Sequence, residues 1–172
     1  ADGEKVYAKV IGMQRISDVD ISVMPMFGRY LPRFGDRIIG IVSEVQLSGW
    51  TMDINSPYAA FLPLSEATEE FVDSRTDLSR FFDKDDVVFC KISRVTKNKT
   101  VQASMRDFMA RKLYGGTIIR VSPTKIPRII GKTGSMIQLI KTKTKCEIYT
   151  GQNGIVWVRG ADKAKAIEAI LT

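Results

Sequence analysis

The sequence predicts a mixed fold, in which an all-β part is followed by an α/β part. Three observations support this prediction. Short β-prone runs fill residues 1–33, five longer β-prone runs lie within residues 34–106, and the pattern then changes to β-α-α-β-β-α within residues 107–172. Segments this small bury little surface alone, so we expect the three to pack against one another.

The first segment, residues 1–33, is predicted to be a small β subdomain. Its β-prone runs lie at residues 6–11 and 21–23. Asp18 and Asp20 lie near the turn between the two runs, and aspartate is a common turn residue.

The middle segment, residues 34–106, is predicted to form a five-stranded barrel. Apolar and polar residues alternate in its second and fourth runs, and Lys97-Asn98-Lys99 supplies a polar turn between the last two. An acidic, partly helical insertion at residues 65–85 follows the third run. Five short strands with one helical insertion are typical of an OB barrel. The expected strands are residues 36–45, 49–54, 58–64, 86–95 and 100–105.

The last segment, residues 107–172, is predicted to form an α/β module. A linker helix over residues 108–114 is expected to end at Gly115-Gly116, and Gly151-Gln152-Asn153-Gly154 indicates a hairpin turn. The expected order is a strand at 117–121, a helical turn at 127–130, a helix at 135–144, strands at 147–149 and 156–158, and a helix at 162–171.

Positive charge is concentrated in this last segment. Residues 110–172 carry 12 Lys/Arg against 3 Asp/Glu, whereas residues 1–109 carry 14 against 16. A basic module on a near-neutral body favours nucleic acid as the partner. Charge alone leaves open the alternative of a solvated basic surface.

The composition argues against catalysis, metal binding and a membrane. Histidine, the commonest general base and metal ligand, is absent from the sequence. The two cysteines, Cys90 and Cys146, lie in separate segments, so we expect small buried hydrophobes in a reducing cytoplasm. No run approaches the ~20 apolar residues of a membrane span. We therefore expect a non-catalytic, cytoplasmic protein without cofactor.

A glycine-containing loop marks the basic segment. Gly131-Lys132-Thr133-Gly134 separates two predicted helices, with Arg128-Ile129-Ile130 before it and Ser135-Met136-Ile137 after it. In this setting the segment resembles a KH domain, whose loop clamps about four nucleotides of backbone. Glycines allow a sugar–phosphate backbone to approach closely, and the following helix N-terminus suits a phosphate.

The flanking residues have predicted roles in RNA binding. Lys132 and Arg128 are expected to supply cations, and Ile129, Ile130 and Ile137 an apolar floor for bases. Two alternatives stay open. The loop could be only a tight helix–helix turn, or the KH fold could be retained as a docking platform while RNA is bound elsewhere.

The middle segment resembles the OB-type repeat of bacterial ribosomal protein S-one. The resemblance is carried by Gly35-Asp36, Gly40-Ile41-Val42, Gly49-Trp50 and the corner at residues 61–66. Such barrels stack bases on an aromatic face ringed by cations.

This barrel departs from the pattern, because Leu47 and Pro63 occupy positions where an aromatic residue and a histidine are usual. Trp50 remains the predicted stacking residue, with simple core packing as its alternative. Arg94, Lys97 and Lys99 are predicted to steer a passing RNA strand.

Taken together, the three segments resemble the KH-bearing, RNA-binding cap subunit of the archaeal exosome. Residues 23–32, 50–58, 125–137 and 151–154 carry this resemblance. It implies a trimeric cap on a hexameric ring of phosphorolytic subunits, with the first segment docked on the ring. It also implies recruitment of single-stranded RNA, including adenine-rich tails, for 3′-to-5′ degradation by the ring. The alternatives are a nuclease or phosphorylase, a translation or elongation factor, and a mainly structural cap.

Overall fold

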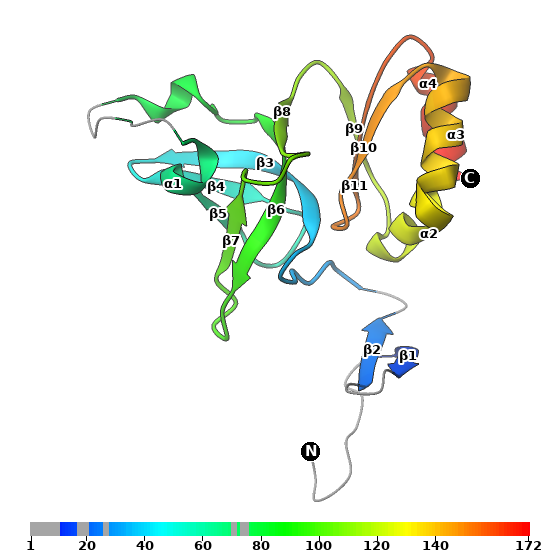
Figure 1. Ribbon diagram of the computed structural model, residues 1–172, viewed down its shortest axis with the longest axis horizontal. Helices are drawn as coiled ribbons and strands as arrows, with labels where there is room; N and C mark the ends of the chain where they lie inside the picture. Colours follow the sequence, from blue (N-terminus) through cyan, green and yellow to red (C-terminus); the bar gives the residue numbers. More distant parts are fainter. Residues whose placement is uncertain (1–10, 17–20, 26–27, 70–71, 73–75) are drawn as a thin grey trace, which may run out of the picture.

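The computed structural model describes residues 11–16, 21–25, 28–69, 72 and 76–172 (Figure 1). At the N-terminal end, β1 (Gly12–Ile16) and β2 (Ile21–Pro25) pair as an antiparallel hairpin. The predicted strand at residues 21–23 is therefore confirmed, whereas residues 6–10 of the other predicted run lie outside the described residues. Among the described residues, no helix is long and apolar enough to cross a membrane.

The middle segment is the predicted five-stranded barrel. Pairing of its first strand with the fourth closes the sheet, and the third and fifth strands pair in parallel. Fully buried side chains such as Ile38, Met52 and Ile92 fill the interior. In sheet order the strands are β3 (Arg37–Gln46), β4 (Gly49–Asp53), β5 (Ala60–Pro63), β7 (Val101–Ser104) and β6 (Val87–Val95), and the insertion holds α1 (Leu64–Ala67) and the 3-10 turn η1 (Leu78–Arg80).

The prediction of a linker helix over residues 108–114 is wrong. Strand β8 (Arg111–Leu113) lies there instead and pairs antiparallel with β6. Leu113 is buried in an apolar cluster with Phe89 of β6, whereas Arg111 at the other end of the short strand is exposed. The barrel sheet consequently extends beyond the predicted boundary at residue 106.

The C-terminal segment has the predicted β-α-α-β-β-α order. A three-stranded antiparallel sheet carries the helices on one face (Figure 1). Apolar side chains including Ile126, Ile140 and Val156 pack together in its core. In chain order the elements are β9 (Thr117–Arg120), the 3-10 turn η2 (Pro123–Lys125), α2 (Ile126–Ile130), the 3-10 turn η3 (Lys132–Gly134), α3 (Ser135–Thr144), β10 (Glu147–Thr150), β11 (Ile155–Arg159) and α4 (Lys163–Leu171).

The turn between β10 and β11 docks on the barrel through one buried side chain. Asn153 is fully buried, and its Nδ2 donates to the backbone oxygens of Ile39 and Ile54, each at 2.8 Å. The Asn153 Oδ1 accepts from the Ile39 backbone N–H at 3.3 Å. The Asn55 Nδ2 donates to the Asn153 backbone oxygen at 2.8 Å. The Asn153 side chain therefore supplies both a donor and an acceptor to the backbone of the barrel.

The neighbours of Asn153 tighten this junction. The Gln152 backbone N–H donates to the Arg37 oxygen at 2.8 Å, and the Gln152 Oε1 accepts from the Arg37 N–H at 2.9 Å. A Cβ at Gly151 would lie 2.7 Å from the backbone nitrogen of Ile39, so only glycine permits this approach. An apolar cluster seals the same junction, and its buried members are Ile39, Phe89, Leu113, Ile155 and Trp157. The expected packing of the two modules is thus observed.

The junction makes Asn153 a strong stability determinant. Asn153→Ala leaves one donor and two acceptors unpaired in a buried site, and each unpaired group costs about 1–3 kcal/mol. We expect the free energy of unfolding to fall by roughly 3 kcal/mol or more. Urea unfolding followed by tryptophan fluorescence measures this loss, because Trp157 lies in the junction cluster.

Gln152→Ala is the matched control, since this exposed side chain accepts a single hydrogen bond, from Arg37. Its cost should stay near about 1 kcal/mol. Equal losses in the two variants would contradict the assignment of the junction to Asn153.

Candidate nucleic-acid interface

The predicted loop Gly131-Lys132-Thr133-Gly134 forms a sharp turn between α2 and α3. Gly131, Thr133 and Gly134 have positive φ values of 75°, 52° and 80°. The Gly131 N–H donates to the Pro127 oxygen at 2.9 Å, which ends α2, and the Gly134 N–H donates to the Gly131 oxygen at 3.2 Å. The side chains of Lys132 and Thr133 are exposed at the tip of this turn.

The two glycines serve different purposes. A Cβ on Gly131 would lie 2.7 Å from the Cβ of Met136, so packing against α3 requires glycine there. A Cβ on Gly134 would have nothing within 4 Å, and only its left-handed backbone favours glycine. The surface outside Gly134 is therefore open to the backbone of a ligand.

The turn presents the N-terminus of α3 at the same surface. The Ser135 N–H donates to the Lys132 oxygen, and no side chain caps this ten-residue helix, so the N–H groups that follow in its first turn keep their capacity to donate to an anion. Lys132 is exposed in the turn that leads into α3 and Arg128 is exposed on α2, and within the described part of the chain no carboxylate lies within 4 Å of either cation. The structure thus places one free cation, Lys132, and accessible backbone directly at the start of a helix.

The predicted apolar floor is only partly exposed. Ile129 is 8% exposed and packs in the KH core, so its predicted role as a floor for bases is not supported by its position. Ile130 and Ile137 are half-buried and remain accessible. Helical geometry explains the difference, because consecutive residues of α2 point in different directions.

Trp50 does not form the stacking platform that was predicted. It is fully buried in the barrel core, where its indole N–H donates to the Phe82 oxygen at 2.8 Å. The Phe82 ring lies edge-on to it, with the ring centroids 5.1 Å apart. The core-packing alternative is therefore the correct one, and the acidic insertion supplies the partner that buries this tryptophan.

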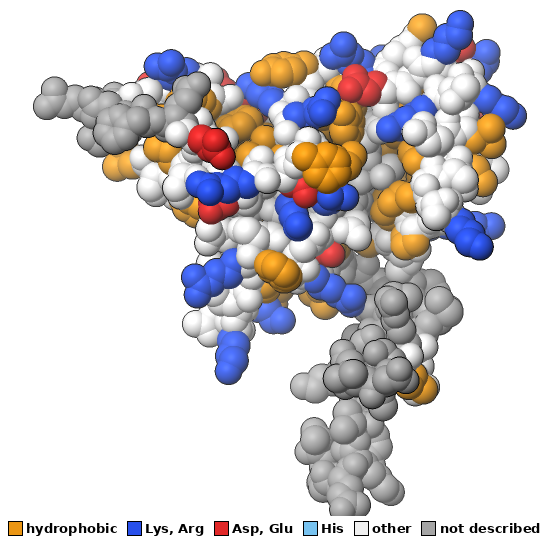
Figure 2. All heavy atoms as spheres, in the orientation of Figure 1, with side chains coloured by type: hydrophobic (Ala, Val, Ile, Leu, Met, Phe, Trp, Pro, Cys, Tyr) orange, Lys and Arg blue, Asp and Glu red, His pale blue; other side chains and the backbone are white. Residues whose placement is uncertain are grey.

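The predicted barrel cations lie apart from the KH loop. Arg94, Lys97 and Lys99 are exposed at the end of β6 and in the turn to β7. Figure 1 shows this turn at the lower end of the barrel, while α2 and α3 lie on the outer side of the KH module. Figure 2 shows further Lys and Arg side chains on both modules. The contact of these three cations with RNA stays a prediction.

The sequence did not indicate a cleft that lies between the barrel and the KH module. It has a volume of about 510 Å³ and is lined from both sides. Its walls come from separate segments, within residues 35–109 on one side and 130–152 on the other, so no local pattern could indicate it. The lining includes Arg37, Lys91 and Met109 from the barrel, and Ile130, Ile137 and Lys141 from the KH module.

Both cysteines are small buried hydrophobes, as expected. Cys90 and Cys146 are free and buried in different cores. Burial raises the pKa of the Cys90 thiol to about 12, so this side chain is a poor nucleophile at neutral pH. Within the described residues, no three His, Cys, Asp or Glu side chains gather in a group that could hold a metal ion.

Two family models match the chain. One is described as "KH domain" and matches residues 116–164, and the other is described as "RRP4, S1 domain" and matches residues 29–94. These ranges agree with the KH module and with most of the barrel.

Curated relatives match almost the whole chain. The exosome complex component Rrp4 of Pyrococcus horikoshii is 40% identical over 99% of this chain and 66% of its own length. The protein of the same name from Methanothermus fervidus is 40% identical over 95% of this chain and 72% of its own length. This chain thus spans about two thirds of the length of these relatives.

A solved structure described as an exosome complex RNA-binding protein has the same architecture. Its TM-score is 0.76 at 28% identity, and the match covers 84% of this chain and 85% of that one.

Trp50 provides a test of the corrected assignment. Trp50→Phe removes the hydrogen bond to Phe82 and leaves a void in the core, so the free energy of unfolding should fall by roughly 2–4 kcal/mol. Because the indole does not reach the surface, the RNA affinity of the folded protein should stay unchanged. Thermal unfolding and fluorescence anisotropy measure the two effects. Reduced affinity at unaltered stability would reinstate Trp50 as a stacking residue.

Proposed function

This chain belongs to the Rrp4 family of exosome complex components, and from that membership we propose that it is a non-catalytic RNA-binding subunit of an exosome cap. In this proposal, three copies cap a hexameric ring of phosphorolytic subunits in the cytoplasm. The cap recruits single-stranded RNA, including adenine-rich tails, and guides it into the ring for 3′-to-5′ degradation. The N-terminal hairpin contacts the ring.

The observation that carries the proposal is the geometry of the KH loop. A phosphate at the N-terminus of α3 accepts from backbone N–H groups and lies beside Lys132. Gly134 leaves room for the sugar–phosphate backbone. These contacts recognise charge and backbone shape, and base edges play no part in them. A subunit that accepts many transcripts needs this kind of recognition.

The barrel fits a guiding role. With Trp50 buried, its described surface offers Arg94, Lys97 and Lys99 as cations to a passing strand. Attraction between exposed cations and phosphates is long-ranged and tolerant of position, so a strand held in this way can still slide. A tight stacking clamp would oppose the threading of RNA toward the ring.

The chemistry of degradation is assigned to the ring. This chain has no histidine, and both of its thiols are buried. Its exposed side chains at the KH loop are suited to binding phosphate by charge and hydrogen bonding. Its contribution to degradation is therefore to raise the local concentration of RNA at the entrance of the ring.

The proposal predicts the effect of reversing charge at the loop. Lys132→Asp/Thr133→Asp keeps both glycines, and aspartate tolerates the left-handed backbone at position 133. We expect the affinity for an adenine-rich single strand to fall by roughly tenfold or more, because phosphate would face two carboxylates. Fluorescence anisotropy measures this loss, with the protein alone and together with the phosphorolytic ring.

The matched control is Lys163→Asp/Lys165→Gln on α4, which changes the net charge by the same amount at exposed positions. It should bind RNA nearly as well as the native chain. If the loop variant remains folded and binds like the control, the KH module is a docking element and the proposed RNA clamp is wrong.

A further inference from the structure

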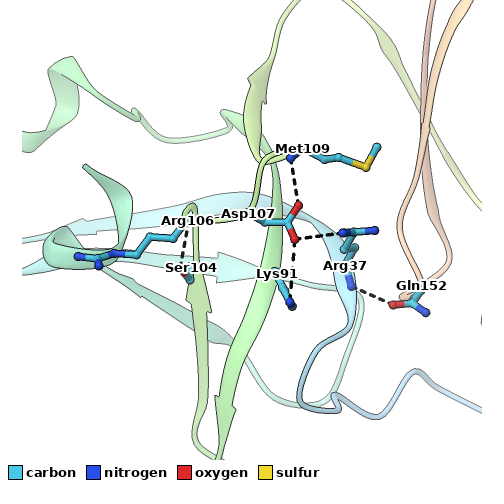
Figure 3. Close-up of polar contacts among 7 residues, drawn as sticks. All are labelled: Arg37, Lys91, Ser104, Arg106, Asp107, Met109 and Gln152. Carbon is cyan, nitrogen blue, oxygen red and sulfur yellow. Dashed lines mark hydrogen bonds and ion pairs between the residues drawn. The ribbon is translucent and has the colours of Figure 1, made fainter. Parts of the chain in front are cut away.

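Helix α3 has two flanks, and one of them faces the barrel. Ile137 and Lys141 lie on this flank and line the cleft between the modules. The opposite wall of the cleft includes Arg37 and Lys91. Arg37 Nε donates to Asp107 Oδ2 at 3.3 Å, and Lys91 Nζ lies 4.0 Å from the same oxygen (Figure 3). This flank of α3 therefore belongs to the site described above.

The other flank of α3 carries exposed side chains that share one face of the helix. Met136, Leu139 and Lys143 are spaced i, i+3 and i+7, so they form one row, called here the outer row. Met136 is 46% exposed and Leu139 is 49% exposed, and neither belongs to the apolar cluster that forms the KH core. Figure 1 shows α3 on the side of the KH module that is turned away from the barrel.

The neighbouring helix also exposes an apolar side chain. Helix α4 contacts α3, and Leu171 at its end is 52% exposed. Single exposed leucines are common on protein surfaces. A pair aligned on one helix, with a third apolar side chain on the helix beside it, instead indicates an interaction surface.

The outer row is held in place by the KH core. Ile140 and Thr144 are the buried residues of α3, and the Thr144 hydroxyl donates to the Ile140 oxygen at 2.7 Å. A Cβ on Gly131 would lie 2.7 Å from the Cβ of Met136, so the backbone of the loop packs directly against the start of the row. A partner therefore meets side chains on a fixed helix, which lowers the entropy lost on binding.

Positive charge surrounds the outer row. Residues 132–146 contain four lysines and no Asp or Glu. Lys143 is exposed, and in the ranges that the structure describes no carboxylate lies within 4 Å of its Nζ. The charge of Lys143 is therefore available to a carboxylate of another molecule.

The chemistry of the outer row fits a protein helix better than it fits RNA. Unpaired bases stack on aromatic rings, and residues 132–146 contain no aromatic residue. Methionine and leucine at i and i+3 instead complement the apolar stripe of an amphipathic helix, and methionine adapts its shape to the partner. The lysines favour a helix whose polar flank is acidic.

We propose that the outer row docks an acidic amphipathic helix of a partner protein. Apolar side chains of this helix pack against Met136 and Leu139, and a carboxylate on its flank pairs with Lys143. Because the cleft lies along the other flank of α3, the docked helix leaves the cleft accessible. This docking is independent of RNA binding.

The test uses two synthetic peptides of about twenty residues, which is long enough for an isolated helix. Both carry leucine at i, i+3 and i+7, and their polar faces carry only Glu in one peptide and only Lys in the other. Fluorescence anisotropy measures their affinity for the full chain. Methyl NMR of labelled methionine locates the binding, because Met136 lies in the outer row and Met52 is buried in the barrel.

The native chain should bind the Glu peptide at least about tenfold more tightly than the Lys peptide. The methyl signal of Met136 should shift on binding, and that of Met52 should stay in place. Met136→Gln/Leu139→Gln should weaken binding of the Glu peptide by about tenfold or more without lowering the melting temperature. Lys143→Glu should move the preference by about tenfold toward the Lys peptide.

The matched control is Leu47→Gln/Lys84→Glu, which makes changes of the same kind at exposed positions of the barrel. It should change the affinity for either peptide by less than about threefold, since it alters only general attraction.

Four outcomes would overturn the proposed docking. The first is an unshifted Met136 signal at saturating Glu peptide. The second is loss of peptide binding in the loop variant but not in the outer-row variants, because the peptide would then bind by charge at the glycine loop. The third is a loss of RNA affinity in Met136→Gln/Leu139→Gln, which would assign the row to RNA. The fourth is a native dimer in sedimentation that this variant converts to a monomer, which would make the occupant a second copy.

The same variants separate the docking from the proposed function. A loop variant that loses RNA and binds the Glu peptide normally would support both. If the loop variant keeps RNA while the outer-row variants lose the Glu peptide, the docking stands and the loop assignment fails.

Discussion

The arrangement of this protein depends on one buried amide. Asn153 satisfies backbone groups of the barrel at both Ile39 and Ile54, which the KH module covers. A buried polar contact of this kind is directional, so it fixes the orientation of the two modules as well as their contact. Gln152 continues the pairing to the backbone of Arg37, whose side chain contacts Asp107. The cleft between the two modules thus depends on the hairpin that docks the KH module.

The KH loop has strained backbone positions and a surface that is accessible to a ligand. Three positions in four have a left-handed backbone, including the non-glycine Thr133, and this conformation is held by the packing of Gly131 against α3. As a result, the N-terminus of α3 has no side-chain cap and lies next to Lys132. In many helices a side chain at this position accepts a hydrogen bond from the first N–H groups. The same local geometry therefore explains why the loop contains glycines and why its surface is suited to an anion.

The sequence was sufficient where local chemistry decides the structure. Alternation along the barrel strands, the turn at Lys97-Asn98-Lys99 and the glycine loop are short-range signals, and the order of elements followed from them. Prediction from the sequence failed where the structure of a residue depends on partners that are distant in the chain. Leu113 belongs to a strand because β6 lies beside it, and Trp50 is buried because Phe82, far along the chain, accepts its N–H. The cleft is the extreme case, since its two walls meet only after Asn153 has docked one module on the other.

The rigid junction also determines how the two modules can move. If they were joined by a flexible linker, each could rotate independently, and a ligand that contacts both could engage them in many geometries. Here their orientation is set by Asn153 and the apolar cluster around Trp157. The exposed cations of the glycine loop therefore keep a fixed separation from those at the end of β6, and a strand too short to cover that separation contacts one module at a time.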